Sequence, residues 1–347
     1  MRSTSSDKAL DQFCLFSQKN GFSALFVHFT HIQRPRNIWN CGYRRSLVLP
    51  DPGGAARVGS NPSGGFVFRK RIAAAFVAAA ALIGMATSAV VSSSPAQAAT
   101  TVPVFDHIVL VMFENHSYSQ INGSSSAPYF NSLAGQGAKF TQSFAVTHPS
   151  EPNYLAMFSG STQGITDDSC PHTFSGNNIA NQLLTAGKSY KSYSEAMPSD
   201  GYTGCSSGTY RRKHNAAPFF SNVPATSNVR FSTFPTDYST LPTVSYVAPD
   251  MCNDMHDCSI STGDTWLKNK MDGYAQWAKT HNSLLIVTFD EDNGGSSNHI
   301  FTTFVGAHTQ VGSFSNQINH YNVLSTIESA YGLSHLNSAA EITNVWN

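Results

Sequence analysis

HIVLVMFENHSY, residues 107–118, decides the fold, because a seven-residue apolar run rich in β-branched side chains ends abruptly in Glu-Asn-His. SLLIVTFDEDNGG, residues 283–295, repeats this design later in the chain. Continuous apolar runs of this length predict strands that are buried on both faces, which is typical of parallel sheets. Since ligands bind at the carboxyl ends of such strands, the polar residues after the two runs are expected to share one site.

Five segments with helical patterns accompany these runs. They span residues 127–137, 153–160, 178–186, 265–281 and 321–331. Strand and helix patterns alternate, which is typical of layered α/β folds. We therefore expect one α/β domain with a central, mainly parallel sheet flanked by helices, for which about 250 residues supply a sizeable core.

The first 98 residues differ in character from the rest. Residues 1–65 show no sustained helix or strand period, so we predict no domain there and interpret them as a spurious or disordered extension. Residues 66–98 combine the basic Arg69-Lys70-Arg71, an alanine-rich apolar run and Ala96-Gln97-Ala98. This order predicts an export signal cleaved after Ala98. A membrane anchor is the alternative, because the run is long enough to span a bilayer, but alanine is only weakly apolar.

Cleavage would leave residues 99–347 as the mature domain, and this part is acidic. It holds 10 basic and 18 acidic residues, a net charge of −8 with histidine neutral. Such a charge argues against nucleic-acid binding and suits a soluble secreted protein, or one that concentrates cations. We expect no stable membrane insertion once the signal is removed.

Four cysteines follow the signal: Cys170, Cys205, Cys252 and Cys258. An even number in an exported chain predicts two disulfides. Three pairings exist, and we favour Cys170–Cys205 with Cys252–Cys258 because short separations make loop closure easier. A zinc site is the alternative, but five residues between Cys252 and Cys258 do not match the spacing of a zinc ribbon.

Acidic residues and a histidine gather at the predicted strand ends. Glu114 and Asn115 follow the first run, and Asp290-Glu291-Asp292 follows the second, with Asn298-His299 close behind. Adjacent acids at a buried strand end are costly unless they bind a cation. Oxygen and imidazole ligands suit a divalent metal rather than a thiolate-bound one.

Two loops add further charged residues. Arg211-Arg212-Lys213-His214-Asn215 can bind a phosphate, although most runs of this kind are solvated surface. Residues 250–258 contain Asp254, His256 and Asp257 inside the shorter expected disulfide loop, which would hold these side chains rigid.

The sequence THPSEPNY, residues 147–154, leads into a helical pattern. Pro152 suits the first turn of a helix, so Ser150 is expected at the positive end of the helix dipole. That environment favours an ionised or phosphorylated serine, which makes Ser150 a candidate nucleophile. A simple N-cap role for Ser150 is the alternative.

Taken together, these motifs resemble the bacterial phosphoesterase family of secreted acid phosphatases and phospholipases C, within the alkaline-phosphatase-like superfamily. The segments that carry the resemblance occur in the family's order: HIVLVMFENHSY (107–118), THPSEPNYLAMFSG (147–160), YRRKHNAAPFF (210–220), APDMCNDMHDCS (248–259) and VTFDEDNG (287–294). They cover nearly all of the predicted domain. The likeness is closest to the short acid-phosphatase branch.

The resemblance implies roles for individual residues. It implies a nucleophile at Ser150 and a divalent metal ion, of unspecified identity, held by Glu114, Asn115, Asp290 and Glu291. The alkaline-phosphatase-like superfamily has the layered α/β fold that the strand and helix pattern predicts.

The resemblance also implies two active-site histidines. We expect His256 to protonate the leaving group, because the short disulfide loop would fix it, and His214 to contact phosphate beside Lys213. Asn153 is a further candidate for contact with the substrate phosphate. Additional site candidates are Asp254, Asp257, Asp292 and His299.

We therefore expect a secreted, metal-dependent phosphomonoesterase of the acid-phosphatase type that works through a phosphoserine. Its expected substrates are phosphorylated small molecules or lipid head groups, with phosphoinositides among the candidates. A phospholipase C-type phosphodiesterase on the same scaffold is one alternative. A non-catalytic secreted metal-binding or adhesion domain is another, and that domain would not need Ser150.

Overall fold

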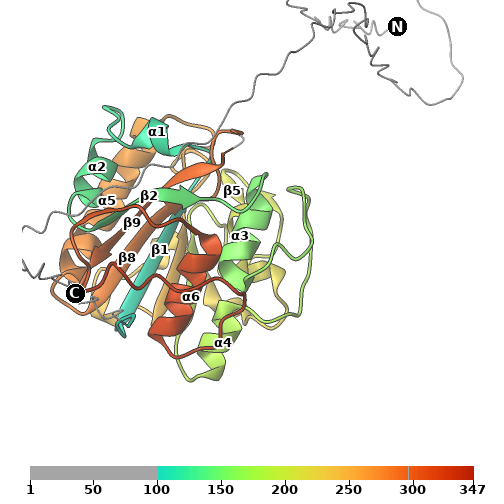
Figure 1. Cartoon of the computed structure of the whole chain (residues 1–347). Coiled ribbons are helices and arrows are strands. Elements are labelled where there is room, and N and C mark those ends of the chain that lie inside the picture. The colour runs from blue at the N-terminus through green and yellow to red at the C-terminus, as the bar shows by residue number, and fades with distance from the viewer. Residues whose placement is uncertain (1–100, 296) are drawn as a thin grey trace, which may run out of the picture. The chain divides into compact units, whose positions relative to one another are not determined.

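The computed structural model describes residues 101–295 and 297–347, so the expectations for residues 1–65 and 66–98 lie outside the described residues. Figure 1 shows a central sheet with helices on both of its faces. Most neighbouring strands of this sheet run parallel, which confirms the predicted α/β class.

The described strands form one nine-stranded sheet and one short hairpin. The order across the sheet is β10 (Gly312–Phe314), β2 (Ala138–Phe144), β9 (His299–Gly306), β8 (Ser283–Phe289), β1 (His107–Phe113), β7 (Val244–Ala248), β3 (Tyr190–Ser194) and β6 (Asn228–Arg230), with β11 (Ile318–Asn319) paired to β2. β9 runs antiparallel to both β8 and β2. The hairpin joins β4 (Ser206–Ser207) to β5 (Tyr210–Arg211).

The two strands predicted from the apolar runs are β1 and β8, and both have the predicted bounds. They pair in parallel, in register from His107 with Ser283 to Phe113 with Phe289. Their carboxyl ends are therefore adjacent, and the residue that follows each strand points into the same region of space.

All five predicted helices are present, with shifted ends. They are α2 (Pro128–Ala134), α3 (Ser150–Ser159), α4 (Ile179–Thr185), α5 (Ile260–Ala278) and α6 (His320–Ala330). The short helix α1 (Tyr118–Ile121) was not predicted. Single 3-10 turns are η1 (Arg212–His214), η2 (Ala217–Phe219), η3 (Ala225–Ser227), η4 (Phe231–Thr233) and η5 (Tyr238–Thr240). The largest shifts concern α3 and α5, which begin three and five residues earlier than the apolar pattern indicated.

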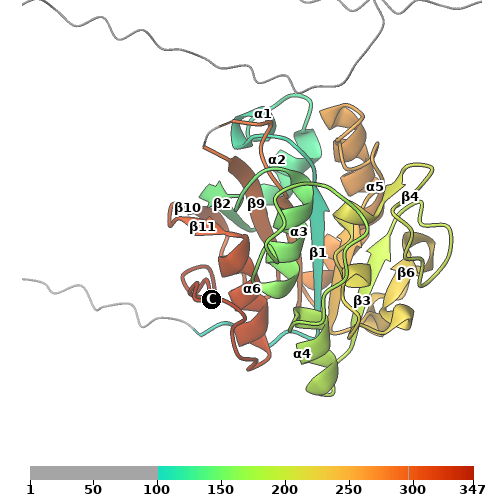
Figure 2. The ribbon, with the colours of Figure 1, turned by 90° about the vertical axis from the view of Figure 1, so that its right-hand side faces the viewer.

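The alternation of side chains along β1 divides the core into two layers. Ile108, Leu110 and Met112 pack with residues of α3, α4 and α6, whereas the intervening positions pack with α2 and α5. Figures 1 and 2 show these two helix groups on opposite faces of the sheet. Burial on both faces explains why β1 is apolar throughout.

The helix α3 lies inside the domain, because all ten of its residues are buried. It begins directly after Pro149 and ends at Gly160, whose φ of 68° is a left-handed conformation that glycine adopts without strain. A Cβ at Gly160 would lie 2.8 Å from Leu336, so the helix end also depends on the missing side chain. Burial on all sides fixes the position of Ser150 at its first turn.

Both favoured disulfides are present. Cys170 pairs with Cys205, and Cys252 pairs with Cys258. Among the described residues, no helix combines the length and apolar character needed to cross a membrane.

Glu328 of α6 gives the fold a dependence on pH. Its Oε1 accepts the Leu336 N–H at 3.0 Å, but its buried Oε2 has no partner among the described residues. Burial raises the pKa of Glu328 from the ordinary 4.5 to about 7. A raised pKa means that the folded state binds the proton more tightly than the unfolded chain, so this contribution to stability is present at low pH and is lost as the pH rises through about 7.

We expect the free energy of unfolding of the wild type to fall between pH 5 and pH 8. Glu328→Gln, which mimics the protonated carboxyl, should reduce this fall by up to about 3 kcal/mol. Urea unfolding of both proteins at the two pH values measures the effect. Equal pH dependence of the variant and the wild type would contradict it.

Candidate active site

Four acidic side chains meet at the carboxyl edge of the sheet. Glu114 follows β1, Asp290 and Glu291 follow β8, and Asp254 lies in the disulfide loop after β7. All four are buried. The backbone joins them, since the Glu114 N–H donates to the Asp254 carbonyl at 2.9 Å and the Asn115 N–H donates to Asp290 Oδ1 at 3.1 Å.

Asn115 makes the turn that this arrangement needs. Its φ of 53° lies in the left-handed region, which asparagine tolerates better than most residues. Its side-chain Nδ2 donates to Glu114 Oε2 at 3.1 Å, so the amide group lies against the acidic cluster. Asn115 also lines the open hollow in front of the carboxylates.

Ser150, at the first turn of α3, points into the acidic cluster. Its Oγ donates to Glu114 Oε2 at 2.9 Å and lies 3.3 Å from Glu291 Oε1. The N-cap residue of α3 is Pro149, and no side chain caps the helix there. Ser150 therefore does not have the simple N-cap role that was the alternative. The nucleophile candidate therefore lies between the acids from two different strand ends.

His214 completes the cluster from η1. Its Nδ1 hydrogen-bonds to Asp254 Oδ2 at 3.0 Å, and its Nε2 lies 3.3 Å from Glu114 Oε2. Burial and the nearby Lys213 hold the pKa of His214 well below its usual range, so the ring is neutral and can act as a ligand. The expected role of His214 is contact with phosphate, but in the structure its ring lies among the buried acids.

The chemistry of this cluster fits a divalent cation. Ligand atoms of Glu114, His214 and Asp254 lie within 4.8 Å of one another. Asp290 Oδ2 is buried and has no partner among the described residues. Without a cation, burial raises the pKa of Glu114 and of Asp290 well above the ordinary value, and the neighbouring carboxylates add to the effect. Four buried acids without a bound counter-charge would repel one another, and a cation removes this cost.

Of the basic run at 211–213, one side chain faces the acids. Arg211 and Arg212 donate to backbone carbonyls, and Arg212 is buried over the ring of Phe219. Lys213 Nζ instead donates to Asp168 at 2.8 Å and interacts electrostatically with the acidic cluster. Lys213 is therefore the member of the run that can meet a phosphate group.

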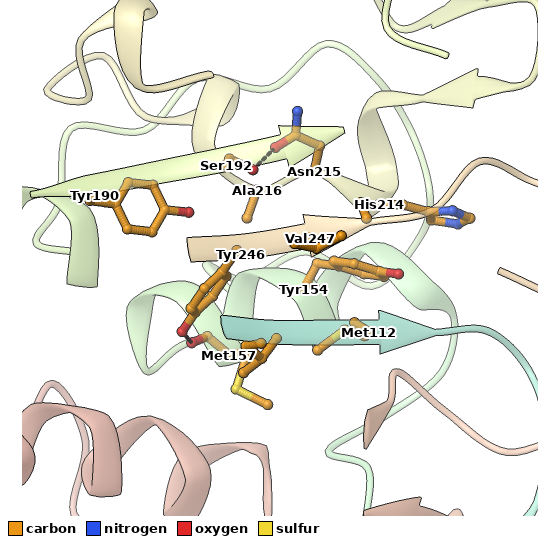
Figure 3. Close-up of a pocket in the computed structure, with 12 residues that line it drawn as sticks. Met112, Tyr154, Met157, Tyr190, Ser192, His214, Asn215, Ala216, Tyr246 and Val247 are labelled. Carbon is orange, nitrogen blue, oxygen red and sulfur yellow. Dashed lines mark hydrogen bonds between the residues drawn. The ribbon is translucent and has the colours of Figure 1, made fainter. Parts of the chain in front are cut away.

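Two spaces of different size adjoin the site, a small cavity and an open hollow. A cavity of about 20 Å³ is lined by residues that include His214 and Tyr154 (Figure 3). The rings of these two residues stack with their centroids 5.3 Å apart. The volume of this cavity is close to that of one water molecule, so it cannot hold a substrate. The open hollow, of about 560 Å³, has a lining that includes Asn115, His148 and Glu291. Glu291, whose Oε1 lies 3.3 Å from Ser150 Oγ, lines this hollow, so the hollow is open space beside the nucleophile candidate.

Comparison with protein families identifies the chain. The sequence model of the Phosphoesterase family matches residues 124–334. The chain belongs to this family. It is a phosphoesterase, a hydrolase of phosphate esters.

Three curated relatives resemble this phosphoesterase. The phosphatidylinositol-3-phosphatase of Mycobacterium tuberculosis is 50% identical over 255 residues, which cover 72% of this chain and 85% of the relative. A probable acid phosphatase of Kluyveromyces lactis is 31% identical and an acid phosphatase of Aspergillus fumigatus is 30% identical, each over 67% of this chain. The chain spans 59% and 56% of these two fungal proteins.

A solved structure shares the fold at low identity. A protein from a study of glycosaminoglycan metabolism by Bacteroides thetaiotaomicron matches with a TM-score of 0.50 and 12% identity, over 69% of this chain and 81% of that chain. A protein in the alkaline phosphatase superfamily from Vibrio parahaemolyticus has a TM-score of 0.49 and 14% identity, over 69% and 70% of the two chains.

Asn153 of the phosphoesterase has a different role from the expected phosphate contact. Its Oδ1 accepts the backbone N–H groups of Val146 and Thr147, and its Nδ2 donates to the carbonyls of Thr147 and Pro149. These four bonds occupy the amide fully. Asn153 therefore holds the loop that leads to Ser150 instead of reaching the substrate.

His256 and Asp257 lie at the rim of the site. His256 Nδ1 hydrogen-bonds to Asp257 Oδ1 at 2.8 Å, and its ring lies 5.8 Å from that of His214. The Asp254 carboxylate fixes this loop by accepting the His256 N–H at 2.8 Å. His256 is partly exposed, which suits a group that exchanges protons with a substrate and with solvent.

Asp292 adjoins the acidic cluster through His148, which also contacts Glu291, whereas His299 lies apart from the cluster. Asp292 Oδ1 accepts the Gly295 N–H at 2.6 Å and lies 3.5 Å from His148 Nε2. His299 Nε2 hydrogen-bonds to the Thr141 carbonyl, and its ring stacks on Tyr118. Among the described contacts, none joins His299 to the acidic cluster, because its position at the start of β9 turns the ring away.

Sequence reasoning missed two side chains that touch the acids. His148 hydrogen-bonds to Glu291 and to the Gly295 carbonyl; burial alone lowers the pKa of His148, but these contacts raise it above its usual range. Tyr154 donates a short hydrogen bond to Glu114 Oε1. Tyr154 lies four residues after Ser150, so helical spacing is the signal that could have placed it on the same face.

His320, the first residue of α6, was also missed. Its ring is buried, and burial lowers the pKa of His320 to about 4, so it is neutral. Its Nε2 donates to the Asp290 carbonyl at 2.6 Å. This bond anchors the turn after β8 to a helix on one face of the sheet, and no local pattern could have shown it.

Proposed function

We propose that this chain is a secreted, divalent-metal-dependent phosphomonoesterase that works through a phosphoserine at Ser150. The observation that carries the proposal is the position of Ser150 Oγ, 2.9 Å from Glu114 Oε2 and 3.3 Å from Glu291 Oε1. Burying a hydroxyl between the acids of two strand ends costs folding free energy. The same position suits a nucleophile, because neighbouring groups can activate the hydroxyl there.

The residues that would hold the cation are Glu114, Asn115, Asp290 and Glu291, with His214 and Asp254 as neighbouring donors. When bound, a divalent cation would neutralise charge on the transferring phosphoryl group and lower the pKa of the serine hydroxyl. The buried, unpartnered oxygen of Asp290 supports this ligand set.

The chain's own residues would carry two steps. In the first, Ser150 Oγ forms a bond to phosphorus while the bond from phosphorus to the substrate oxygen breaks. The alcohol departs with a proton from His256. In the second, water attacks the phosphorus and gives a proton back to His256, while the bond from phosphorus to Ser150 Oγ breaks. Oγ regains its proton from Glu291 as inorganic phosphate is released. Lys213 would hold the phosphoryl oxygens, and Glu291, at 3.3 Å, can accept the proton that Ser150 gives up.

The substrate class follows from the relatives and from the charge of the site. The Mycobacterium tuberculosis relative is named for phosphatidylinositol 3-phosphate, and the fungal relatives are named acid phosphatases. We infer phosphate monoesters, with phosphoinositide head groups among the candidates. Two disulfides and the signal pattern of residues 66–98 support secretion.

Release of phosphate tests this function. The mature protein should release inorganic phosphate from phosphatidylinositol 3-phosphate and from a simple alkyl phosphate, and it should leave a choline phosphodiester intact. Cleavage of the diester with no action on the monoesters would favour a phospholipase C reaction instead.

His256→Ala tests the proton donor. An alkyl leaving group needs a proton, whereas nitrophenolate is already stable, so the variant should be slowed about a hundredfold on an alkyl phosphate and less than about fivefold on nitrophenyl phosphate. Steady-state kinetics on the two substrates measure this difference. His335→Ala is the control, because His335 contacts Ser329 on the surface of α6. Equal slowing on both substrates would assign His256 another role.

A further inference from the structure

Asp168 connects the nucleophile helix with the loop that carries Lys213. Its Oδ1 accepts the N–H of Glu151, the residue after Ser150, at 2.9 Å. Its Oδ2 accepts from Lys213 Nζ at 2.8 Å. One carboxylate therefore contacts both the first turn of α3 and the ammonium group of Lys213.

The segment that bears Asp168 is itself closed into a ring. Cys170, two residues later, is bonded to Cys205. The Cys205 carbonyl accepts the N–H of Arg212, the neighbour of Lys213, at 3.0 Å. The path from Asp168 through the disulfide and back to Lys213 is thus closed by one covalent bond and two hydrogen bonds.

The guanidinium of Arg212 reinforces this ring. It donates to the carbonyls of Thr203, His172 and Pro218 at 2.7, 2.9 and 2.7 Å. The loop after α3 and the loop before η1 are therefore joined through the Arg212 side chain. An isolated surface ion pair would lack this support and would contribute little.

Lys213 has acidic neighbours other than Asp168. Its ammonium group interacts electrostatically with Glu114 and Asp290, which lie in the acidic cluster. A lysine side chain is flexible, so a free Lys213 would turn toward these carboxylates and compete with a cation there. Asp168 offers the opposing charge at a fixed place.

We propose that Asp168 is a positioning residue that holds Lys213 beside Ser150 for contact with the substrate phosphate and keeps it away from Glu114 and Asp290. This inference rests on the proposed phosphomonoesterase function. It assigns Asp168 no contact with the substrate. Its effect should therefore appear in phosphate binding more than in turnover.

The chain offers a matched control next to this residue. Asp167 is exposed, and its Oδ1 accepts from the N–H and the hydroxyl of Ser169. Asp167→Asn removes the same charge from the same loop without touching Lys213. Asp168→Glu keeps the charge and tests whether a carboxylate restores the ion pair that holds Lys213 in place, which we call the clamp.

The experiment measures KM for nitrophenyl phosphate, the inhibition constant of inorganic phosphate, and kcat. Asp168→Asn should raise KM and the inhibition constant about tenfold and change kcat less than about threefold. Asp167→Asn should stay within about twofold of the wild type, and Asp168→Glu should recover most of the loss. In a Lys213→Ala background, Asp168→Asn should change KM by less than about twofold, because the side chain it positions is gone.

Three results would overturn the clamp while the wild type is active: equal kinetics of Asp168→Asn and Asp167→Asn, a loss confined to kcat, or an undiminished effect in the Lys213→Ala background. A wild type that releases no phosphate would overturn the proposed function, and the clamp with it. Thermal unfolding of each variant separates these results from a loss of fold.

Discussion

Replacing Ser150 by alanine is expected to lower kcat by about three orders of magnitude or more, while the protein stays folded. The substitution removes the oxygen that would bond to phosphorus, and the neighbouring acids cannot replace it. Since Ser150 lies at the first turn of a helix buried on all sides, the small change in volume should leave α3 in place. Steady-state kinetics on a phosphomonoester measure the effect.

The matched control for this variant is Ser159→Ala. Ser159 is buried at the other end of α3, where its hydroxyl donates to the Leu155 carbonyl. Its loss should lower stability and leave kcat within about twofold of the wild type. If Ser150→Ala kept more than about a tenth of the wild-type kcat, a covalent serine would be ruled out.

Asp290→Asn is expected to remove bound metal and activity together. Asparagine keeps an oxygen that can accept the Asn115 N–H, but it lacks the charge that a cation needs. Metal content by mass spectrometry and phosphate release should both fall by about tenfold or more. Treatment of the wild type with a chelator should have the same effect on activity.

Asp264→Asn is the control for a buried aspartate outside the site. Asp264 accepts the N–H groups of Tyr129 and Phe130 at the start of α2. Its replacement should lower stability and leave metal content unchanged. Full activity of a chelated, metal-free wild type would refute the metal account and would favour a different nucleophile chemistry.

The strand ends could be predicted from sequence because the apolar runs of β1 and β8 leave no alternative to burial on both faces. Their adjacency followed from the rule that ligand sites lie at carboxyl ends of parallel strands. The strands β2 and β9 were not predicted, since threonines and other polar residues interrupt their apolar pattern. In the folded domain these hydroxyls find buried partners, as Ser143 and Thr302 do at 2.8 Å.

The composition of the site was predictable only in part. Glu114, Asp290 and Glu291 sit where the motifs indicated. The contacts of Asn153, His214 and the residues that were missed depend on tertiary packing. Asn153 faces its own loop, and His214 turns inward because Asp254 and Glu114 lie on either side of it. Helical spacing could have placed Tyr154 on the face of Ser150, but no spacing in the sequence reports the contacts of Asn153 and His214.

The steric course at phosphorus tests the central claim most directly. A phosphomonoester made chiral at phosphorus with oxygen isotopes, hydrolysed by the wild type, yields inorganic phosphate whose configuration can be read. Two successive displacements, first by Ser150 and then by water, predict retention of configuration. Inversion would show a single direct attack by water and would contradict the phosphoserine account.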